Sequence, residues 1–454
     1  MTIFTPADHL NRLAKRAMDS GAADSVEAAM AALRGYRLTI DFAPDGGSEA
    51  TDQVALLTAI VLARRVFLGG VSVSGPLDGV LLTRVGEGQF LREAVIALGA
   101  TVGSPIPRTP SLAIGGGARQ NVSSFAVRAV YAGWRGGIVP AHRDPPFESG
   151  APATPLAAML AAAFGVNEAF LHIADDSRVA GRRSVGLSLW DPVVDWLAPA
   201  TEPRLRFLPS RLWLIGLGHL GQAYLWALGL LPYTDTSALH LILQDTDIVT
   251  PSTESTSILT NSSMIRQRKT RTTAAWAEQR GFMTTLTERP FDAHTIRGSD
   301  EPAVALCGVD NAEARRCLDR TGFDFVVEAG LGRGHRDFRS ILVHTLPGDL
   351  SCRELWPEPA PASSFAVEQA PAYRRLLDEK AVDQCGVIIL AGKAVGAPFV
   401  GAVAATLVVS EVLRLLQGGA VHKLIDLNLV DPAYRKVLIN PREFGSLNPG
   451  FVEV

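Results

Sequence analysis

The ten residues LWLIGLGHLG, from Leu212 to Gly221, decide the fold of this chain. An apolar run stops at a Gly-x-Gly-x-x-Gly spacing, and the apolar residues of the following AYLWALGLL recur at helical intervals. This order predicts a buried strand, a tight turn and the start of a helix. Gly216 would permit the turn, Gly218 would let a phosphate approach the backbone, and Gly221 would let the helix pack closely on the strand. The free N–H groups of such a helix start bind anions, so the motif predicts a nucleotide site without naming the nucleotide.

Length and composition narrow the class of protein. A chain of 454 residues has room for two or three domains, and its 47% hydrophobic content is enough for large buried cores. The formal net charge of -3 gives no reason to expect nucleic acid or a membrane as a partner. The N-terminal residues contain no apolar core of a signal peptide, and charged residues and a proline interrupt the longest apolar tract, residues 387–416. We therefore expect a cytoplasmic protein.

From Arg211 onward, predicted strands alternate with predicted helices. We expect strands at 239–243, 304–308, 325–330 and 339–346, and helices near 219–230, 264–280 and 311–320. That alternation predicts an α/β fold with a mostly parallel, doubly wound sheet. A Pro-rich stretch of mixed polarity at 191–210 has the composition of a linker. It divides the chain into two predicted domains, 1–195 and 196–454.

An internal repetition indicates that the two domains are copies of one fold. PLAAMLAAAFGVNEAF begins at Pro155 and PFVGAVAATLVVSEVL begins at Pro398, with small residues and a glutamate at matching positions. Residues 111–117 and 129–137 likewise resemble 304–310 and 326–334. Chance similarity of Ala-rich buried helices is the alternative. If the copies are real, the first is degenerate, since it has Gly117 where the second has Asp310, and the second carries an insertion at about 348–397.

Three polar positions in the second half are candidates for nucleotide chemistry. Asp245 follows the second strand and is placed to accept hydrogen bonds from ribose hydroxyls, or is a turn residue. Asp310 follows a later strand, where it would hold a magnesium ion or act as a helix N-cap with Glu313 as its capping-box partner, and both roles can coexist. Lys269 is one of four cations within residues 266–271. They are either solvated charges on a helix or groups that stabilise negative charge on a phosphate.

The order of these segments resembles the ThiF/MoeB and ubiquitin-activating (E1-like) enzyme superfamily over residues 211–430. The matching segments are GLGHLG, QDTDIV, Lys269, CGVDNAEARR, EAGLGRG, a Cys-bearing crossover and APFVGAVAATLVVSEVLRLL. The resemblance implies two Rossmann-like, adenylation-type halves, the first inactive and the second active. It implies that Mg-ATP is bound and that the C-terminal glycine of a ubiquitin-like protein is adenylated. The length and compact insertion are most similar to activating enzymes from bacterial operons for ubiquitin-like conjugation.

The resemblance also assigns roles to individual residues. Gly216, Gly218 and Gly221 would line the phosphate loop, Asp245 would hold ribose and Lys269 would contact phosphate. Asp310 would hold magnesium, with Asn311 and Arg315 completing the motif. The chain departs from the family at TPSTESTSILT, where an Asn and an Arg-Gln pair are usual, so an arginine contact would have to come from Arg266, Arg268 or the first half. Paired Cys-x-x-Cys zinc ligands are absent from the sequence, so a structural zinc is not expected.

Many members of the superfamily transfer the acyl group to a cysteine on the crossover. By that resemblance Cys385 is our candidate acceptor, with Cys352 as the alternative, because both lie in the predicted insertion. Cys307 and Cys317 have the surroundings of core residues. Lys393, eight residues after Cys385, would stabilise a thiolate or has a structural or solvated role.

The sequence thus predicts activation of a ubiquitin-like protein, thioester formation on Cys385 and transfer to a conjugating-enzyme-like partner. One alternative is an adenylyltransferase for a sulfur carrier that forms no enzyme thioester. Others are an NAD(P)-dependent oxidoreductase, which fits GLGHLG and Asp245 but not DNAEARR, and a non-catalytic scaffold that binds a ubiquitin-like protein. Because two similar halves already pair within one chain, a homodimer is not required, but it is not excluded.

Overall fold

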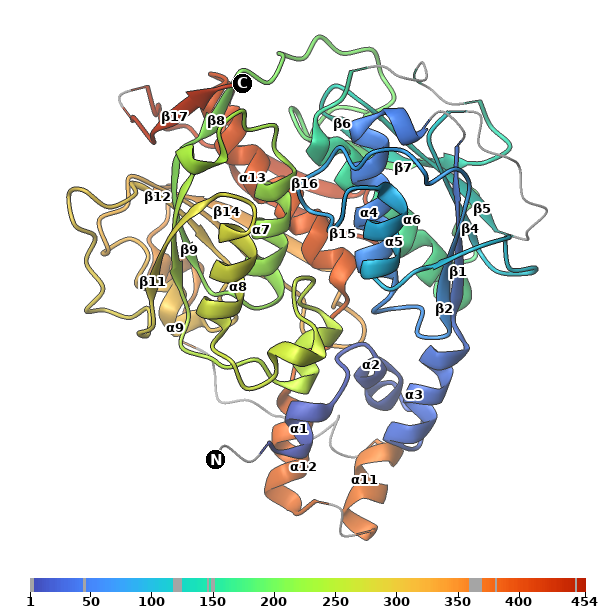
Figure 1. The fold of residues 1–454 in the computed structure, drawn as a ribbon. Coiled ribbons are helices and arrows are strands. Elements are labelled where there is room, and N and C mark those ends of the chain that lie inside the picture. The colour runs from blue at the N-terminus through green and yellow to red at the C-terminus, as the bar shows by residue number, and fades with distance from the viewer. Residues whose placement is uncertain are drawn as a thin grey trace.

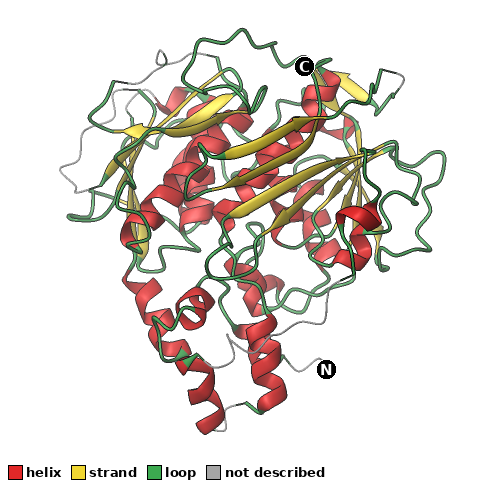
Figure 2. Ribbon diagram, turned by 180° about the vertical axis from the view of Figure 1, so that it is seen from behind, coloured by secondary structure: helices red, strands yellow, loops and turns green. Residues whose placement is uncertain are grey.

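A computed structural model describes residues 4–43, 46–116, 125–144, 147, 152–358, 370–379, 382–445 and 447–454. Two β-sheets lie on either side of a central layer of helices, and a smaller group of helices projects from one end of the molecule (Figure 1). The view from behind shows the same three layers and the same projecting group (Figure 2).

The first sheet has seven strands among the described residues, in the order β3-β2-β1-β4-β5-β6-β7. Neighbouring strands from β3 to β5 are parallel, and β6 and β7 are antiparallel additions. The strands are β1 (Arg37–Phe42), β2 (Gly70–Ser74), β3 (Thr101–Val102), β4 (Ser111–Ile114), β5 (Ala126–Ala132), β6 (Arg135–Pro140) and β7 (Val185–Ser188).

The second sheet repeats this order and adds one strand, giving β11-β10-β9-β12-β13-β14-β15-β16. Neighbours from β11 to β13 are parallel, and β14 to β16 are antiparallel. The strands are β9 (Arg211–Ile215), β10 (His240–Gln244), β11 (Met283–Thr287), β12 (Val304–Cys307), β13 (Phe325–Leu331), β14 (Ser340–Leu346), β15 (His422–Asn428) and β16 (Arg435–Ile439). A separate pair joins β8 (Phe207–Pro209) to β17 (Phe451–Glu453).

The matching strand orders confirm the predicted fold of two Rossmann-like halves. The repeated segments fall on equivalent elements: β4 with β12, β5 with β13, and helix α6 (Pro155–Ile173) with helix α13 (Pro398–Leu416). Proline stands at the first helical position of both α6 and α13, where its missing N–H costs no hydrogen bond. Gly117, which the sequence comparison set opposite Asp310, lies outside the described residues.

The central layer consists of α6, α13, α4 (Ala50–Ala63) and α7 (His219–Leu230). These helices are apolar on all sides, as expected for helices covered by protein all round. By length and composition α6 and α13 could cross a membrane, but 89% of each apolar window is buried inside the protein. Residues of both halves therefore contribute to one continuous hydrophobic core.

Two buried glutamates at matching positions of α6 and α13 link the halves in a reciprocal way. Glu168 on α6 pairs with Arg183, which also donates to the backbone carbonyl of Val430 in the second half. Glu411 on α13 pairs with Arg414, which donates to the carbonyl of Leu189 in the first half. Each half thus uses its own glutamate–arginine pair to hold the other half's chain.

The projecting group brings the N-terminal helices and the crossover helices together. It contains α1 (Pro6–His9), α2 (Ala14–Asp19) and α3 (Val26–Gly35) with the crossover helices α11 (Pro371–Asp378) and α12 (Gln384–Gly392) (Figure 1). Buried Lys15 and the hydroxyl of Tyr373 both bind the carboxylate of Asp19, which fixes α11 on α2. The helices outside this group and the central layer are α5 (Leu91–Ala97), α8 (Lys269–Glu278), α9 (Ala312–Arg315) and α10 (Cys352–Leu355).

Replacing Arg414 with methionine tests the link between the halves. Its guanidinium lies 2.6 Å from the Glu411 carboxylate, and the two side chains are 1% and 0% exposed. Removing one partner of a buried ion pair leaves an uncompensated charge, so we expect a loss of about 3–5 kcal/mol of unfolding free energy. The measurement is urea denaturation followed by tryptophan fluorescence at neutral pH.

The matched control is Arg375→Met, which breaks an exposed pair with Glu379 and should cost at most about 1 kcal/mol. Burial would raise the pKa of Glu411, but Arg414 and His422 outweigh it and hold that pKa below its usual value. The contribution of Arg414 should therefore be lost as the pH falls through this lowered folded-state pKa. Equal losses for the two variants at neutral pH would contradict the assignment.

Candidate functional site

A cavity of about 930 Å³ opens where the order of the second sheet reverses, beyond the carboxyl ends of β9, β10 and β12. Ligands of open α/β sheets bind at such a reversal. Four parts of the chain line the cavity: the Gly-rich turn after β9, the loop after β10, the segment after β12, and the N-terminal and crossover helices. Of the residues that the sequence predicted, it brings together Gly216, Gly218, Asp245, Lys269, Asp310, Asn311 and Arg315.

The Gly-rich turn has the geometry of a phosphate loop. Gly216 has a φ of +84°, which only glycine adopts without strain. Gly218 is the N-cap of α7, and a Cβ there would meet only the Lys269 Nζ at 3.9 Å, so the backbone is open to the cavity. Gly221 does not line the cavity; a Cβ there would lie 2.0 Å from the Gly216 carbonyl oxygen, so glycine is required for helix–turn contact.

Asp245 joins the Gly-rich turn to the loop after β10. Its two carboxylate oxygens accept hydrogen bonds from the backbone N–H groups of Leu217 and Asp247, each at 2.7 Å. Carboxylate oxygens accept more than one hydrogen bond, so Asp245 retains capacity for a ligand hydroxyl. Asp245 therefore holds the rim of the cavity in place and is itself part of the cavity lining.

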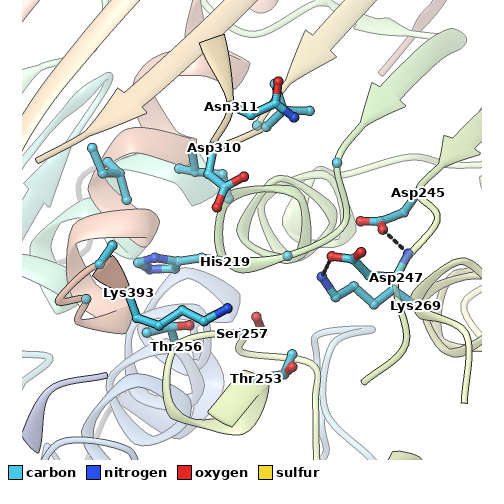
Figure 3. Close-up of a pocket in the computed structure, with 18 of the residues that line it drawn as sticks. His219, Asp245, Asp247, Thr253, Thr256, Ser257, Lys269, Asp310, Asn311 and Lys393 are labelled. Atoms are coloured by element: carbon cyan, nitrogen blue, oxygen red, sulfur yellow. Dashed lines mark hydrogen bonds and ion pairs between the residues drawn. The ribbon is translucent and has the colours of Figure 1, made fainter. Parts of the chain in front are cut away.

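Asp247, which the sequence analysis did not select, is the partner of Lys269. The Lys269 Nζ lies 2.7 Å from the Asp247 carboxylate at the cavity wall (Figure 3). Burial lowers the pKa of Lys269, but the charges of Asp245, Asp247 and Asp310 outweigh it and raise that pKa. Lys269 is thus held as a cation beside the Gly-rich turn. The second acid of QDTDIV was the available sequence signal for Asp247.

Asp310 and Asn311 have different roles at the start of α9. The alternative that Asp310 is the N-cap is wrong, because Asn311 holds that position and its side chain accepts from the Ala314 N–H at 2.7 Å. Among the described residues no hydrogen bond or ion pair involves the exposed Asp310 carboxylate, which points into the cavity while Asn311 points away (Figure 3). The carboxylate is free to hold a ligand or metal.

Arg315 lies at the base of the cavity and is engaged by protein groups. Its guanidinium is 2.7 Å from the Glu328 carboxylate, which is 1% exposed, and it donates to the Val309 carbonyl at 2.8 Å. These contacts tie the segment after β12 to β13 and so position Asp310. A ligand that contacted Arg315 would have to share its guanidinium with the Glu328 carboxylate and the Val309 carbonyl.

Hydroxyl side chains stand where the superfamily usually has an Asn and an Arg-Gln pair. Thr253, Thr256 and Ser257 line the cavity. Their loop is held from the first half by the buried Arg65, which donates to the carbonyls of Glu254, Ile258 and Thr260 at 2.8–2.9 Å. The degenerate half thus shapes the wall of this cavity.

An arginine from the first half also lines the cavity. Neither Arg266 nor Arg268 lines the cavity, but Arg12 does. Burial lowers the pKa of Arg12, and the facing charge of Asp310 opposes that change. Its Nη1 is buried without a hydrogen-bond partner among the described residues. No short motif pointed to Arg12, because it lies far from the cavity residues in sequence.

The four cysteines are all free, and only Cys385 is exposed. Burial raises the pKa of both Cys307 and Cys352 to about 12, which disfavours their thiolates. Cys385 lies in the first turn of α12, outside the cavity lining, although Ile388 and Ile389 one turn later line it. About 5 Å of helix axis therefore separates Cys385 from the cavity rim. Lys393 is at the far end of α12 and is not beside this thiol.

Replacing Gly221 with alanine tests the geometry of the turn. The added methyl would overlap the Gly216 carbonyl and force α7 away from β9. We expect a loss of about 1–3 kcal/mol of unfolding free energy, together with weaker nucleotide binding. The measurements are thermal unfolding and calorimetric titration with ATP. Gly35→Ala is the control, because a Cβ there meets nothing within 4 Å; equal behaviour of the two variants would contradict the role of Gly221.

Comparisons with known proteins show which family this is. The BilD N-terminal domain model matches residues 37–189, and the BilD C-terminal domain model matches residues 208–419. The bacterial E1-like protein BilD of Collimonas sp. (strain OK412) is 44% identical over 446 residues, which cover 97% of this chain and 95% of that protein.

Solved structures are more distant. Escherichia coli MccB with MccA-N7isoASN has a TM-score of 0.36 at 13% identity, and the same protein with ATP has a TM-score of 0.34 at 13% identity. Each match covers 52% of this chain and 65% of the MccB chain, so this chain spans just under two thirds of the length of MccB. The extended match to the Collimonas protein decides the assignment: the chain belongs to the BilD family of bacterial E1-like proteins, within the superfamily that its motifs resemble.

Proposed function

We propose that this protein uses ATP to activate the C-terminal carboxylate of a ubiquitin-like protein, forms a thioester on Cys385 and passes the acyl group to a conjugating-enzyme-like partner. The observation that carries the proposal is the free Asp310 carboxylate in a cavity with Lys269 and Arg12 beside a phosphate-type turn. Membership of an E1-like family supports it.

ATP suits the cavity in size and in chemistry. A volume of about 930 Å³ is within the usual range of small-molecule sites. The open backbone at Gly218 and the start of α7 would bind phosphate. Asp245 would accept hydrogen bonds from ribose, and the hydroxyls of Thr253, Thr256 and Ser257 offer further polar contacts. The cations Lys269 and Arg12 would balance the phosphate charge.

Asp310 would hold a magnesium ion. Among the described residues no group of three or more His, Cys, Asp or Glu side chains could hold a metal. Magnesium at nucleotide sites needs only one or two carboxylates, because phosphates and water supply the other ligands. An exposed, unpaired carboxylate facing the phosphate turn fits that need. When bound, the ion would neutralise phosphate charge.

The first half-reaction would be adenylation. A carboxylate oxygen of the substrate's C-terminus would attack the α-phosphorus of ATP, the bond to the bridging oxygen would break, and pyrophosphate would leave. Lys269 and Arg12 would stabilise the negative charge that grows on the phosphate oxygens. Asp247 would keep Lys269 aimed at the turn, since the two side chains are 2.7 Å apart.

The second half-reaction would use Cys385. Its thiolate, after losing a proton to solvent, would attack the acyl carbon, and the bond to the AMP oxygen would break. The thiol is exposed in the first turn of α12, so an acyl group held at the cavity rim could approach it. The partner's cysteine would then take the acyl group by the same exchange. A cytoplasmic setting, with ATP and reducing conditions, suits four free cysteines.

A sulfur-carrier adenylyltransferase that forms no enzyme thioester is the second candidate. The placement of Cys385 outside the cavity lining favours it. The exposure of this one thiol, on a helix that itself lines the cavity, favours the thioester route. The two candidates share the adenylation step and differ only in the need for Cys385.

ATP–pyrophosphate exchange, measured with the ubiquitin-like protein encoded nearest to this gene, tests both half-reactions. Asp310→Ala should lower exchange by on the order of 100-fold or more, because it removes the carboxylate that would hold magnesium against the phosphates. Cys385→Ala should keep exchange but lose a thiol-sensitive adduct on non-reducing gels, and Cys317→Ala is the control that should keep both. Normal turnover by Cys385→Ala would favour the sulfur-carrier reaction, and no exchange in the wild type would refute adenylation.

Arg12→Ala tests the contribution of the first half. We expect exchange to fall by on the order of tenfold or more, because a charge-assisted hydrogen bond to phosphate contributes about 1.5–3 kcal/mol. Arg34→Ala, an exposed position on α3, is the matched control and should behave as the wild type. Unchanged exchange in both variants, with the same thermal stability, would remove Arg12 from the site.

A further inference from the structure

The buried carboxylate of Glu328 on β13 lies behind the cavity wall and contacts two side chains. Its Oε1 is 2.7 Å from the Nε of Arg315, and its Oε2 is 3.3 Å from the Nδ1 of His344. A carboxylate oxygen only accepts hydrogen bonds, so His344 is the donor. Glu328 is 1% exposed and does not line the cavity, whereas Arg315 does. Each oxygen of this carboxylate is therefore engaged by a different residue.

The sheet fixes the positions of these three side chains. His344 is directly opposite Glu328 in the antiparallel register of β13 and β14. The His344 ring packs edge-on against Trp356, with 5.6 Å between the ring centroids. Room for the Arg315 guanidinium comes from Gly330, where a Cβ would lie 3.4 Å from Nη2. Glu328 is thus held between His344 and Arg315 with little freedom to move.

The contact with Glu328 occupies the charge of Arg315. The two atoms of this ion pair, Arg315 Nε and Glu328 Oε1, make no hydrogen bond with a described residue, so each relies on the opposite charge of the other. Arg315 lines the cavity together with Asp310, which comes directly before the N-cap of the same short helix. Without Glu328, the guanidinium would be attracted to the Asp310 carboxylate. Such a pair would occupy the group that the proposed function assigns to magnesium.

Two other cations near Asp310 are also kept out of contact with it. Lys269 is paired with Asp247 at 2.7 Å. The charge of Arg12 acts on Asp310, but no ion pair joins these two described side chains. The structure thus keeps positive charge near the Asp310 carboxylate and still leaves that carboxylate unpaired.

We propose that Glu328, held by His344, is a positioning residue that keeps Arg315 away from Asp310 and so leaves the Asp310 carboxylate open to a divalent cation. This inference rests on the proposed function, because that function gives Asp310 its metal. Neither Glu328 nor His344 would touch the nucleotide, and both would act through Arg315.

Nucleotide binding to the full chain, with and without magnesium, tests this role without turnover. The probe is the α,β-methylene analogue of ATP, titrated by calorimetry in saturating magnesium and again in EDTA. The ratio of the two affinities measures what the metal adds to binding. Glu328→Gln frees Arg315, so this ratio should fall on the order of fivefold, which is the value of an ion pair at a half-exposed site. The affinity in EDTA should not fall, because Arg315 would then screen Asp310 from the phosphates.

Two further variants separate restraint of Arg315 from a simple change of charge. Glu328→Asp keeps the charge but shortens the side chain, so it should lower the ratio about threefold. His344→Leu removes only the hydrogen bond to Glu328 and should have a similar effect, and it carries the test if Glu328→Gln does not fold. Glu168→Gln is the matched control, because it removes a buried carboxylate paired with Arg183 in the first half; it should leave the ratio unchanged.

Removing the arginine should reverse the effect. The double variant E328Q/R315M lacks the competing cation, so its ratio should return to within about twofold of the wild type. Arg315→Met alone should show a ratio at least as large as that of the wild type. A loss in Glu328→Gln that Arg315→Met does not reverse would overturn the inference, since that result indicates a general disturbance of the cavity.

The outcomes separate this inference from the proposed function. A wild type that binds no nucleotide, or a ratio that Asp310→Ala does not change, would refute the proposed role of Asp310. A ratio that depends on Asp310 but is the same in Glu328→Gln and His344→Leu as in the wild type would overturn only the inference. A fall confined to Glu328→Gln, with Glu328→Asp and His344→Leu unchanged, would also overturn it, because charge alone would then account for the effect.

Discussion

The contact of α6 with α13 between the two sheets is the constraint on which the rest of this molecule depends. Both helices are apolar on all sides, and neither half alone could cover its own. The buried carboxylates of Glu168 and Glu411 would be costly in that layer without their arginines. Because Arg183 and Arg414 each also bind a carbonyl of the opposite half, the charge that stabilises one half fixes its position against the other.

This fixed relation explains how the first half contributes to the cavity of the second half. Arg65 follows α4 and holds the loop with Thr256 and Ser257 through three carbonyl contacts. Arg12 reaches the cavity from the segment between α1 and α2, and its carbonyl binds the crossover at Gly396. Both arginines would miss their targets if the halves shifted by a few ångströms. The packing of the first half and its two arginines therefore matter to the cavity in the second half.

The sequence predicts those features that local chemistry determines. The strand, turn and helix around Gly216 follow from apolar periodicity and the need for a positive φ. The repeated helices at Pro155 and Pro398 follow from their shared pattern. Features that depend on distant parts of the chain were missed: nothing local indicates that Arg12 faces Asp310. Local signals can also mislead, since Asp310 and Glu313 have the spacing of a capping box but Asn311 takes the cap.

The helix that carries Cys385 is packed less firmly than the helix that precedes it. On α12 only Val387 and Leu390 are buried among the described residues, so releasing this helix would expose two apolar side chains, a cost of about 3–6 kcal/mol. The preceding helix is held more firmly, because Tyr373 on α11 is fully buried and bonded to Asp19. The burial of Val387 and Leu390 holds α12, and with it the thiol, beside the cavity rim, while α11 and the N-terminal helices fix the rest of the projecting group.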